Sequence, residues 1–336
     1  MNLLNLFLKS DPGASSGVRA PIVHPSLREG GKEERSAVVA LGGGGARGIA
    51  HLGVMQSIGD AGVRTERIVG VSMGSLAGAM CAHDPDVLRV QAKAIELLHS
   101  PIFQLKQEIL FGAGPPSEHE SSGGISSWVG RIRHYMRAHQ KLTRAVTKAS
   151  LISNDPLRES IDYLLPDVGI EDLHTPLSIV AVDLLSGQRI VLEKGSLRKA
   201  VLASASIPGI FPPIPWDDML LADIGVIESI PVLVANAYAT DLTIGVDVGQ
   251  DSNKVESCGT ALETMMRMDD ICERLMRCHL TDAADIMIRP DVGNVAWFDF
   301  SNPERLIAEG RKASGKTLER SGLLKPKSKP IISVGA

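Results

Sequence analysis

The hydrophobic positions of the chain alternate between short, almost wholly apolar runs and longer stretches of helical period. The clearest apolar runs are residues 36–41, 67–71, 177–185, 188–193, 241–249 and 285–289. Runs of this length without polar alternation are typical of strands buried on both faces of a parallel sheet. The clearest helical stretches are residues 48–60, 259–280 and 303–320. Strand, glycine-rich turn, helix and strand follow one another at the start, which is the order of a βαβ unit. The pattern predicts an α/β chain with a mainly parallel central sheet in a three-layer α/β/α arrangement.

The same pattern divides the chain into three parts. Residues 1–35 are rich in Pro, Gly and Ser without a sustained period, so we expect a loosely ordered leader. Residues 36–322 form one predicted domain, and residues 323–336 form a tail that we expect to be frayed. Within the domain, a loop of Gly, Pro, Ser, Glu and His at residues 112–127 interrupts a helical region. Whether this loop is a lid is left open by the sequence.

Composition narrows the function classes. The chain has 336 residues, and 35 basic against 39 acidic residues give a net charge of −4. A nucleic-acid-binding protein would normally carry a basic excess, so we expect no nucleic-acid partner. Four scattered cysteines favour a reducing compartment over a disulfide framework, and no ligand cluster suggests a metal. No window approaches the roughly 20 apolar residues of a membrane span. We therefore expect a cytoplasmic protein, soluble or peripherally bound to a membrane.

A G-x-S-x-G motif at residues 70–74 is the sharpest local signal. It lies where a predicted strand meets a predicted helix, which is the context that such a motif needs to expose Ser72 as a nucleophile. Gly70 and Gly74 fit because bulky side chains beside the serine would collide in a tight turn. The alternative is a turn of small residues in which Ser72 only caps the helix.

A glycine-rich loop at residues 42–48 follows the first predicted strand. Gly43, Gly45 and Gly48 match the G-x-G-x-x-G fingerprint of a dinucleotide site, and exposed backbone N–H groups there could hold any phosphate or oxyanion. A nicotinamide site would want an acidic residue at the end of the second strand. That strand instead runs into Ser72. An anion cradle beside a nucleophile therefore favours acyl transfer over hydride transfer.

The serine needs a base, and the sequence offers no convincing histidine. Only His174 and His279 lie far downstream, and His279 fits better as a cation at a helix C-terminus. Asp223 follows an apolar approach and precedes a glycine at position 225. From its residue type and position alone, Asp223 is explained as an Asx-turn residue at least as well as it is explained as the base.

Together, the glycine loop, the G-x-S-x-G motif, the small-residue and proline-rich stretch at residues 203–213 and the late Asp223 resemble the patatin-like phospholipase family. The resemblance runs from about residue 38 to 313, and residues 288–292 are similar to its bacterial neuropathy-target-esterase-like branch. It implies a three-layer patatin-like fold. It also implies a Ser–Asp dyad in place of a triad, with Ser72 as nucleophile and Asp223 as general base.

The resemblance also implies an oxyanion hole in the glycine loop. The residues it assigns there are Gly43, Gly44, Gly45 and Arg47. Gly225 belongs to the motif turn after the aspartate. The family usually has glycine directly after the aspartate, whereas this chain has Ile224 there, so a side chain could shift the Asp223 carboxylate.

The implied function is a serine lipid acyl hydrolase that cleaves carboxylic esters of phospholipids or lysophospholipids through an acyl-enzyme, without a cofactor. Two alternatives stay open. The glycine loop could serve a phosphate- or dinucleotide-binding module in which Ser72 is incidental, or the chain could be an inactive lipid-binding homologue, which Ile224 makes conceivable.

A basic segment at residues 128–148 is a candidate for peripheral membrane contact. It carries no acidic residue, and its apolar residues recur at helical spacing. A basic amphipathic helix can lie on an anionic membrane. The alternative is a solvated charged face whose apolar stripe belongs to the core.

Overall fold

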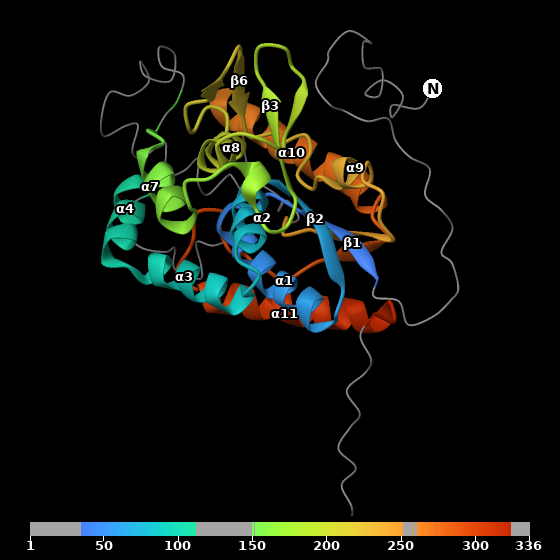
Figure 1. Cartoon of the computed structure of the whole chain (residues 1–336). Coiled ribbons are helices and arrows are strands. Elements are labelled where there is room, and N and C mark those ends of the chain that lie inside the picture. The colour runs from blue at the N-terminus through green and yellow to red at the C-terminus, as the bar shows by residue number, and fades with distance from the viewer. Residues whose placement is uncertain (1–34, 112–149, 151, 251–257, 259–260, 324–336) are drawn as a thin grey trace, which may run out of the picture.

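The computed structural model describes residues 35–111, 150, 152–250, 258 and 261–323 (Figure 1). The expected leader and tail therefore lie outside the described residues, apart from Arg35 and Leu323. The loop at residues 112–127 and the basic segment at residues 128–148 also lie outside them.

An eight-stranded sheet lies at the centre of the described chain. Its parallel strands are β1 (Ser36–Leu41), β2 (Arg64–Val71), β3 (Leu177–Asp183), β7 (Leu242–Val246) and β8 (Ile286–Ile288). Three further strands pair antiparallel at one side: β4 (Arg189–Leu192), β5 (Ile214–Trp216) and β6 (Met219–Ala222). The order along the sheet is β5-β6-β3-β2-β1-β7-β8, with β4 pairing off this path on β3. The sheet is mixed and mainly parallel, as the apolar runs predict.

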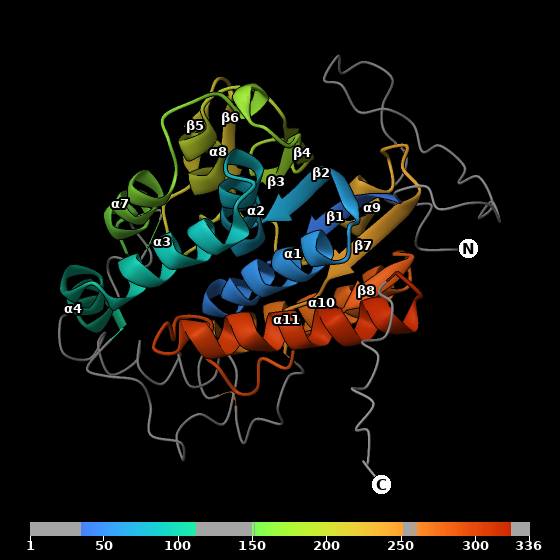
Figure 2. The same ribbon diagram turned by 60° about the horizontal axis from the view of Figure 1, so that its bottom comes forward.

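Helices cover both faces of the sheet (Figures 1 and 2). The larger core cluster joins one face of the strands to α1 (Ala50–Asp60), α2 (Met73–His83), α3 (Val87–His99), α7 (Asp155–Leu164), α8 (Leu197–Ser204) and α11 (Pro303–Arg320). The smaller cluster packs the opposite face against α9 (Val232–Ala235), beside which α10 (Ala261–Thr281) runs. The remaining described helices are α4 (Pro101–Phe111) and the short 3₁₀ turns Gly45–Ile49 and Ile170–Asp172. Strand alternation explains the division, since Val39 and Leu41 enter one cluster and Val38 and Ala40 the other.

The structure departs from the sequence pattern mainly at short elements. The second strand begins at Arg64 rather than at residue 67, and the third ends at Asp183 rather than at residue 185. The β5–β6 hairpin was not predicted, because three- or four-residue strands carry too few positions to show a period. The eight-residue helix α8 was also not predicted.

The strand registers bring two candidate residues to the same level of the sheet. Val71 of β2 pairs with Val180 of β3, and Ala222 of β6 pairs with Val182 of β3. Because β2 runs parallel to β3 and β6 antiparallel to it, the next residue of each strand comes level with Ala181. Val180 and Val182 also pair with β4 on their other side, so β2 and β6 share one side of β3. Ser72 and Asp223 therefore meet on that side, at the carboxyl edge of the parallel strands.

Candidate active site

Ser72 occupies a strained turn between β2 and α2. Its φ of 53° and ψ of −125° are rare for a residue with a side chain, and such outliers persist where the surroundings over-determine them. The Ser72 carbonyl accepts hydrogen bonds from the Ser75 hydroxyl at 2.6 Å and from the Ser75 N–H at 2.9 Å. The turn is thus fixed by the first residues of the helix that it starts.

The two motif glycines are required by close backbone approach. A Cβ on Gly74 would lie 2.1 Å from the Leu41 carbonyl oxygen, and one on Gly70 would lie 2.6 Å from the Gly74 carbonyl oxygen. Both distances are far below any real contact, so side chains at these positions would push the start of α2 away from the ends of β1 and β2. These close approaches are of the kind that the sequence analysis expects beside the serine.

The small-residue stretch that begins at the end of α8 contacts both Ser72 and Asp223. The fully buried Ser204 accepts a hydrogen bond from the Ser72 N–H at 2.9 Å and donates its own proton to the Val180 carbonyl at 2.7 Å. Two residues later, the Ser206 carbonyl accepts a hydrogen bond from the Asp223 N–H at 2.9 Å. The sequence showed this stretch as dense in small residues, but gave no sign that its serines hold Ser72 and Asp223.

The Ser72 side chain faces the Asp223 carboxylate, and hydrogen bonding from its hydroxyl contributes to the pKa of Asp223. Burial of Asp223 raises its pKa from 3.8 to about 6, while the bonds from Ser72 and from the Gly225 N–H act in the opposite direction. Desolvation disfavours the charged carboxylate, which makes it a stronger proton acceptor than an exposed aspartate. The pair therefore has the contact and the basicity that general-base activation of a serine needs.

Asp223 forms an Asx turn and also lies beside Ser72, so the two sequence interpretations of this residue do not exclude each other. The Gly225 N–H donates to Asp223 Oδ1 at 2.7 Å, which is an Asx turn. Ile224 points away from this site, because its buried side chain packs in the smaller core cluster. The structure therefore removes the expected conflict, since Ile224 does not displace the carboxylate from Ser72.

The glycine loop lies directly beside the nucleophile, at the end of the strand next to β2. A Cβ on Gly43 would stand 3.2 Å from the Ser72 Cβ. One expectation is wrong in detail: the Gly43 N–H donates to the Ser229 carbonyl at 2.8 Å and so is not free for an oxyanion. Within the described part of the chain, the Gly44 and Gly45 N–H groups have no such partner. They are the amides that the loop leaves for a ligand.

Arg47 braces this loop instead of pointing at the serine. Its Nε donates to the Gly44 carbonyl at 3.0 Å. Because the peptide unit is planar, holding this carbonyl also fixes the direction of the Gly45 N–H on its other side. Removal from water lowers the pKa of Arg47 to about 10, an effect that Glu273 and Asp247 partly offset, so the side chain remains cationic at neutral pH.

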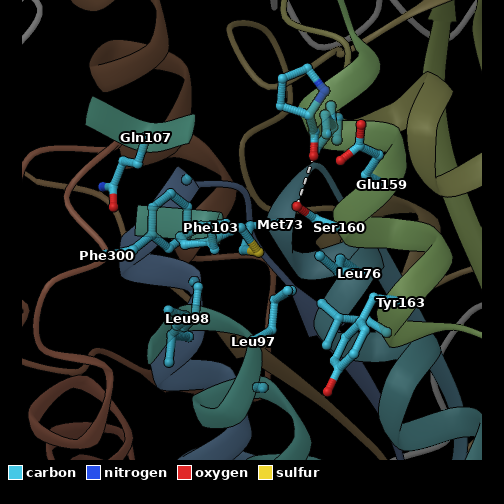
Figure 3. A pocket seen from close by; sticks show the side chains of 18 of the residues that line it. Met73, Leu76, Leu97, Leu98, Phe103, Gln107, Glu159, Ser160, Tyr163 and Phe300 are labelled. Atoms are coloured by element: carbon cyan, nitrogen blue, oxygen red, sulfur yellow. Dashed lines mark hydrogen bonds between the residues drawn. The ribbon is translucent and has the colours of Figure 1, made fainter. Parts of the chain in front are cut away.

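An apolar cavity of about 490 Å³ opens from Ser72 and Gly45 (Figure 3). Its walls come from the glycine loop, α2, α3, α4, α7 and the loop before α11. Phe103 meets Phe300 edge to face at 5.5 Å on one side, and Tyr163 stands on the other (Figure 3). Apolar walls next to a nucleophile suit a hydrocarbon chain better than a polar substrate.

The downstream histidines take no part in this arrangement. His279 is exposed in the last turn of α10, the helix C-terminal position that the sequence analysis favours for it. His174 is exposed near His83, which ends α2. Ser72 lies at the other end of that helix, and its eleven residues span about 16 Å.

None of the helices that the structure describes is long and apolar enough to cross a bilayer. The expected membrane contact through residues 128–148 lies outside the described residues and stays a prediction.

Comparison with known proteins places the chain in a family. The sequence profile described as Patatin-like phospholipase matches residues 39–236, more than half of the chain, and this match includes both Ser72 and Asp223. The chain belongs to the patatin-like phospholipase family.

Two relatives illustrate the extent of the likeness. Patatin-like phospholipase domain-containing protein 6 of Mus musculus is 30% identical over 227 residues, which are 67% of this chain and 14% of that protein. An uncharacterized NTE family protein of Mycobacterium tuberculosis is 28% identical over 223 residues, 66% of this chain and 52% of that protein. The chain thus matches only part of each relative's length. The crystal structure of VipD from Legionella pneumophila aligns with a TM-score of 0.46 at 15% identity, over 92% of this chain and 71% of that one.

Proposed function

We propose that this protein is a serine hydrolase that cleaves carboxylic ester bonds of phospholipids or lysophospholipids. Ser72 is the nucleophile and Asp223 is the general base. The observation that carries the proposal is the proximity of the Ser72 hydroxyl to a buried carboxylate with a raised pKa, beside an apolar cavity. Family membership supports a lipid substrate.

The reaction proceeds in two half-reactions. Asp223 takes the hydroxyl proton as Ser72 Oγ attacks the ester carbonyl, and the tetrahedral oxyanion accepts hydrogen bonds from the Gly44 and Gly45 N–H groups. The carbon–oxygen bond to the alcohol then breaks, and Asp223 returns its proton to the leaving alkoxide. Water next attacks the acyl-enzyme with Asp223 again taking a proton. The acid leaves when this proton passes to Ser72 Oγ, which restores the enzyme.

The cavity gives the substrate its orientation. The acyl chain enters the apolar space lined by Leu76 and Phe103, which places its carbonyl carbon at Ser72 and leaves the head group outside. The cavity lining also includes polar side chains, among them an ion pair between Lys106 and Glu159. Burial of a hydrocarbon chain contributes about 0.8 kcal/mol for each methylene group, so long-chain esters bind more tightly than short ones.

Labelling with a fluorophosphonate probe tests the proposal. The reagent phosphonylates a serine only when its hydroxyl is activated, so we expect wild-type protein to label and Ser72→Ala not to label. Asp223→Asn should label at least about a hundredfold more slowly, since general-base catalysis contributes about 10²–10⁴-fold. Ser160→Ala is the matched control, because its hydroxyl lines the same cavity but donates to Pro156 within α7.

Two outcomes would overturn the proposal. One is a folded wild-type protein that does not label, in which case binding of NAD(P) or of phospholipid vesicles would distinguish the dinucleotide-binding and inactive lipid-binding alternatives. The other is labelling that persists in Ser72→Ala.

A further inference from the structure

Hydrogen bonds from other parts of the chain hold most of the peptide units of the glycine loop. His51 Nε2 contacts the Gly42 carbonyl at 2.7 Å, and the N–H of the same peptide, on Gly43, donates to Ser229. At the other end of the loop, Arg47 holds the Gly44 carbonyl and the Ala46 N–H donates to the Trp297 carbonyl at 2.6 Å. The peptide between Gly43 and Gly44 is thereby fixed by its two neighbours.

We propose that His51 is a positioning residue that aligns the oxyanion hole by clamping the Gly42–Gly43 peptide. This inference rests on the proposed hydrolase function. A carbonyl can only accept, so His51 must donate from Nε2, which defines its tautomer. The hydrogen bond from His51 fixes the orientation of the Gly42–Gly43 peptide plane. The orientation of this plane in turn determines the direction of the Gly44 N–H beside Ser72.

The surroundings of His51 indicate a role beyond packing. The side chain is fully buried in the first turn of α1, and its Nδ1 has no hydrogen-bond partner among the described residues. A buried acceptor without a partner is costly, so an apolar residue would serve a pure packing role better. Burial also lowers the pKa of His51 to about 4, against the effects of its bond to Gly42 and of Asp247, and the ring is therefore neutral near pH 7.

The neutral ring is well suited to this task. A protonated side chain beside the oxyanion loop would change the local field with pH, whereas neutral His51 holds Gly42 without adding charge. The hydrogen bond crosses from α1 to the end of β1, so it also ties the loop to a rigid helix. The loop amides then keep their direction when a substrate oxygen arrives, which is the preorganisation that oxyanion stabilisation requires.

Two isosteric amides provide the test. Glutamine places its amide nitrogen four bonds from Cα, as histidine places Nε2, whereas asparagine places its nitrogen at the position of Nδ1, one bond short. We expect His51→Asn to lower kcat about 10- to 100-fold with KM unchanged, as is typical of lost support around a catalytic group. His51→Gln should retain kcat within about threefold, because it restores the donor to Gly42.

The controls separate this inference from the proposed function. Absence of hydrolysis and of Ser72 labelling in the wild type would reject the function itself. If the wild type is active, equal kcat values in folded His51→Gln and His51→Asn would overturn the role of His51, as would a change confined to KM. Should both variants fail to fold, ¹⁵N NMR of the wild-type imidazole decides: the Nε2–H tautomer supports the clamp and the Nδ1–H tautomer rejects it.

Discussion

Lowering the pH should inactivate the enzyme far sooner than an ordinary aspartate would allow. Asp223 must be ionised to take the proton of Ser72, so activity rises with pH through the pKa of this carboxyl. Burial places that pKa at about 6 instead of 3.8. The acid limb of kcat/KM is therefore expected about two pH units higher than for an exposed carboxylate.

The size of the effect follows from the titration curve. With a pKa of about 6, the carboxylate fraction is roughly 99% at pH 8 and roughly 9% at pH 5, so kcat/KM should fall about tenfold between them. With a pKa of 3.8, the same change in pH would remove only about 6% of the activity. The two cases are easily separated by experiment.

Protonation of Asp223 also changes the stability of the fold, in the opposite direction to its effect on activity. A carboxyl whose pKa is raised in the folded state binds protons more tightly there than in the unfolded chain. Its contribution to stability is present below pH 3.8 and is lost as the pH rises through about 6. Protonation of Asp223 at pH 5 therefore inactivates the site while favouring the fold.

The assay is hydrolysis of a neutral fatty-acyl ester between pH 4.5 and 8.5, with circular dichroism at each pH to confirm folding. The pKa of His51, about 4, lies below this window. A profile that stays flat down to pH 5 in folded protein would refute the assignment of Asp223 as a desolvated general base.

Two further substitutions probe the nucleophile turn and the cavity. Ser204→Ala removes the acceptor of the Ser72 N–H and the donor to the Val180 carbonyl. We therefore expect the free energy of unfolding, measured in urea, to fall by about 1–3 kcal/mol, together with a lower kcat. Unchanged stability and kcat would contradict this role of Ser204. Ala77→Leu fills part of the cavity wall, so kcat/KM for a long-chain ester should fall about tenfold while that for an acetyl ester changes little. An equal fall for both esters would mean that the cavity does not hold the acyl chain.

Much of the site could be anticipated because its strongest signals are local. A serine between two motif glycines marks a tight turn where a strand meets a helix, and the glycine loop marks a second turn at the end of the strand before it. β1 and β2 are parallel neighbours, so the turns that follow them lie at the same edge of the sheet. Asp223 was different, since only the family resemblance distinguished it from an ordinary Asx-turn residue.

The antiparallel hairpin that carries Asp223 shows why local patterns were insufficient. β6 has four residues, too few for a period to emerge, yet its register on β3 is what brings Asp223 level with Ser72. The pKa of the carboxyl also depends on how deeply the packed chain buries it, and burial is a property of the whole fold.

The sequence by itself determined the tight turn at Ser72 and the mainly parallel strands of the sheet, because backbone sterics and hydrophobic period act on neighbouring residues. Only the tertiary structure decided which amides of the glycine loop are available and which side chains hold it. The Gly43 N–H is taken by Ser229, and the Ala46 N–H is taken by Trp297. These partners lie almost two hundred residues or more along the chain, and no spacing rule connects positions that meet only after the sheet has assembled.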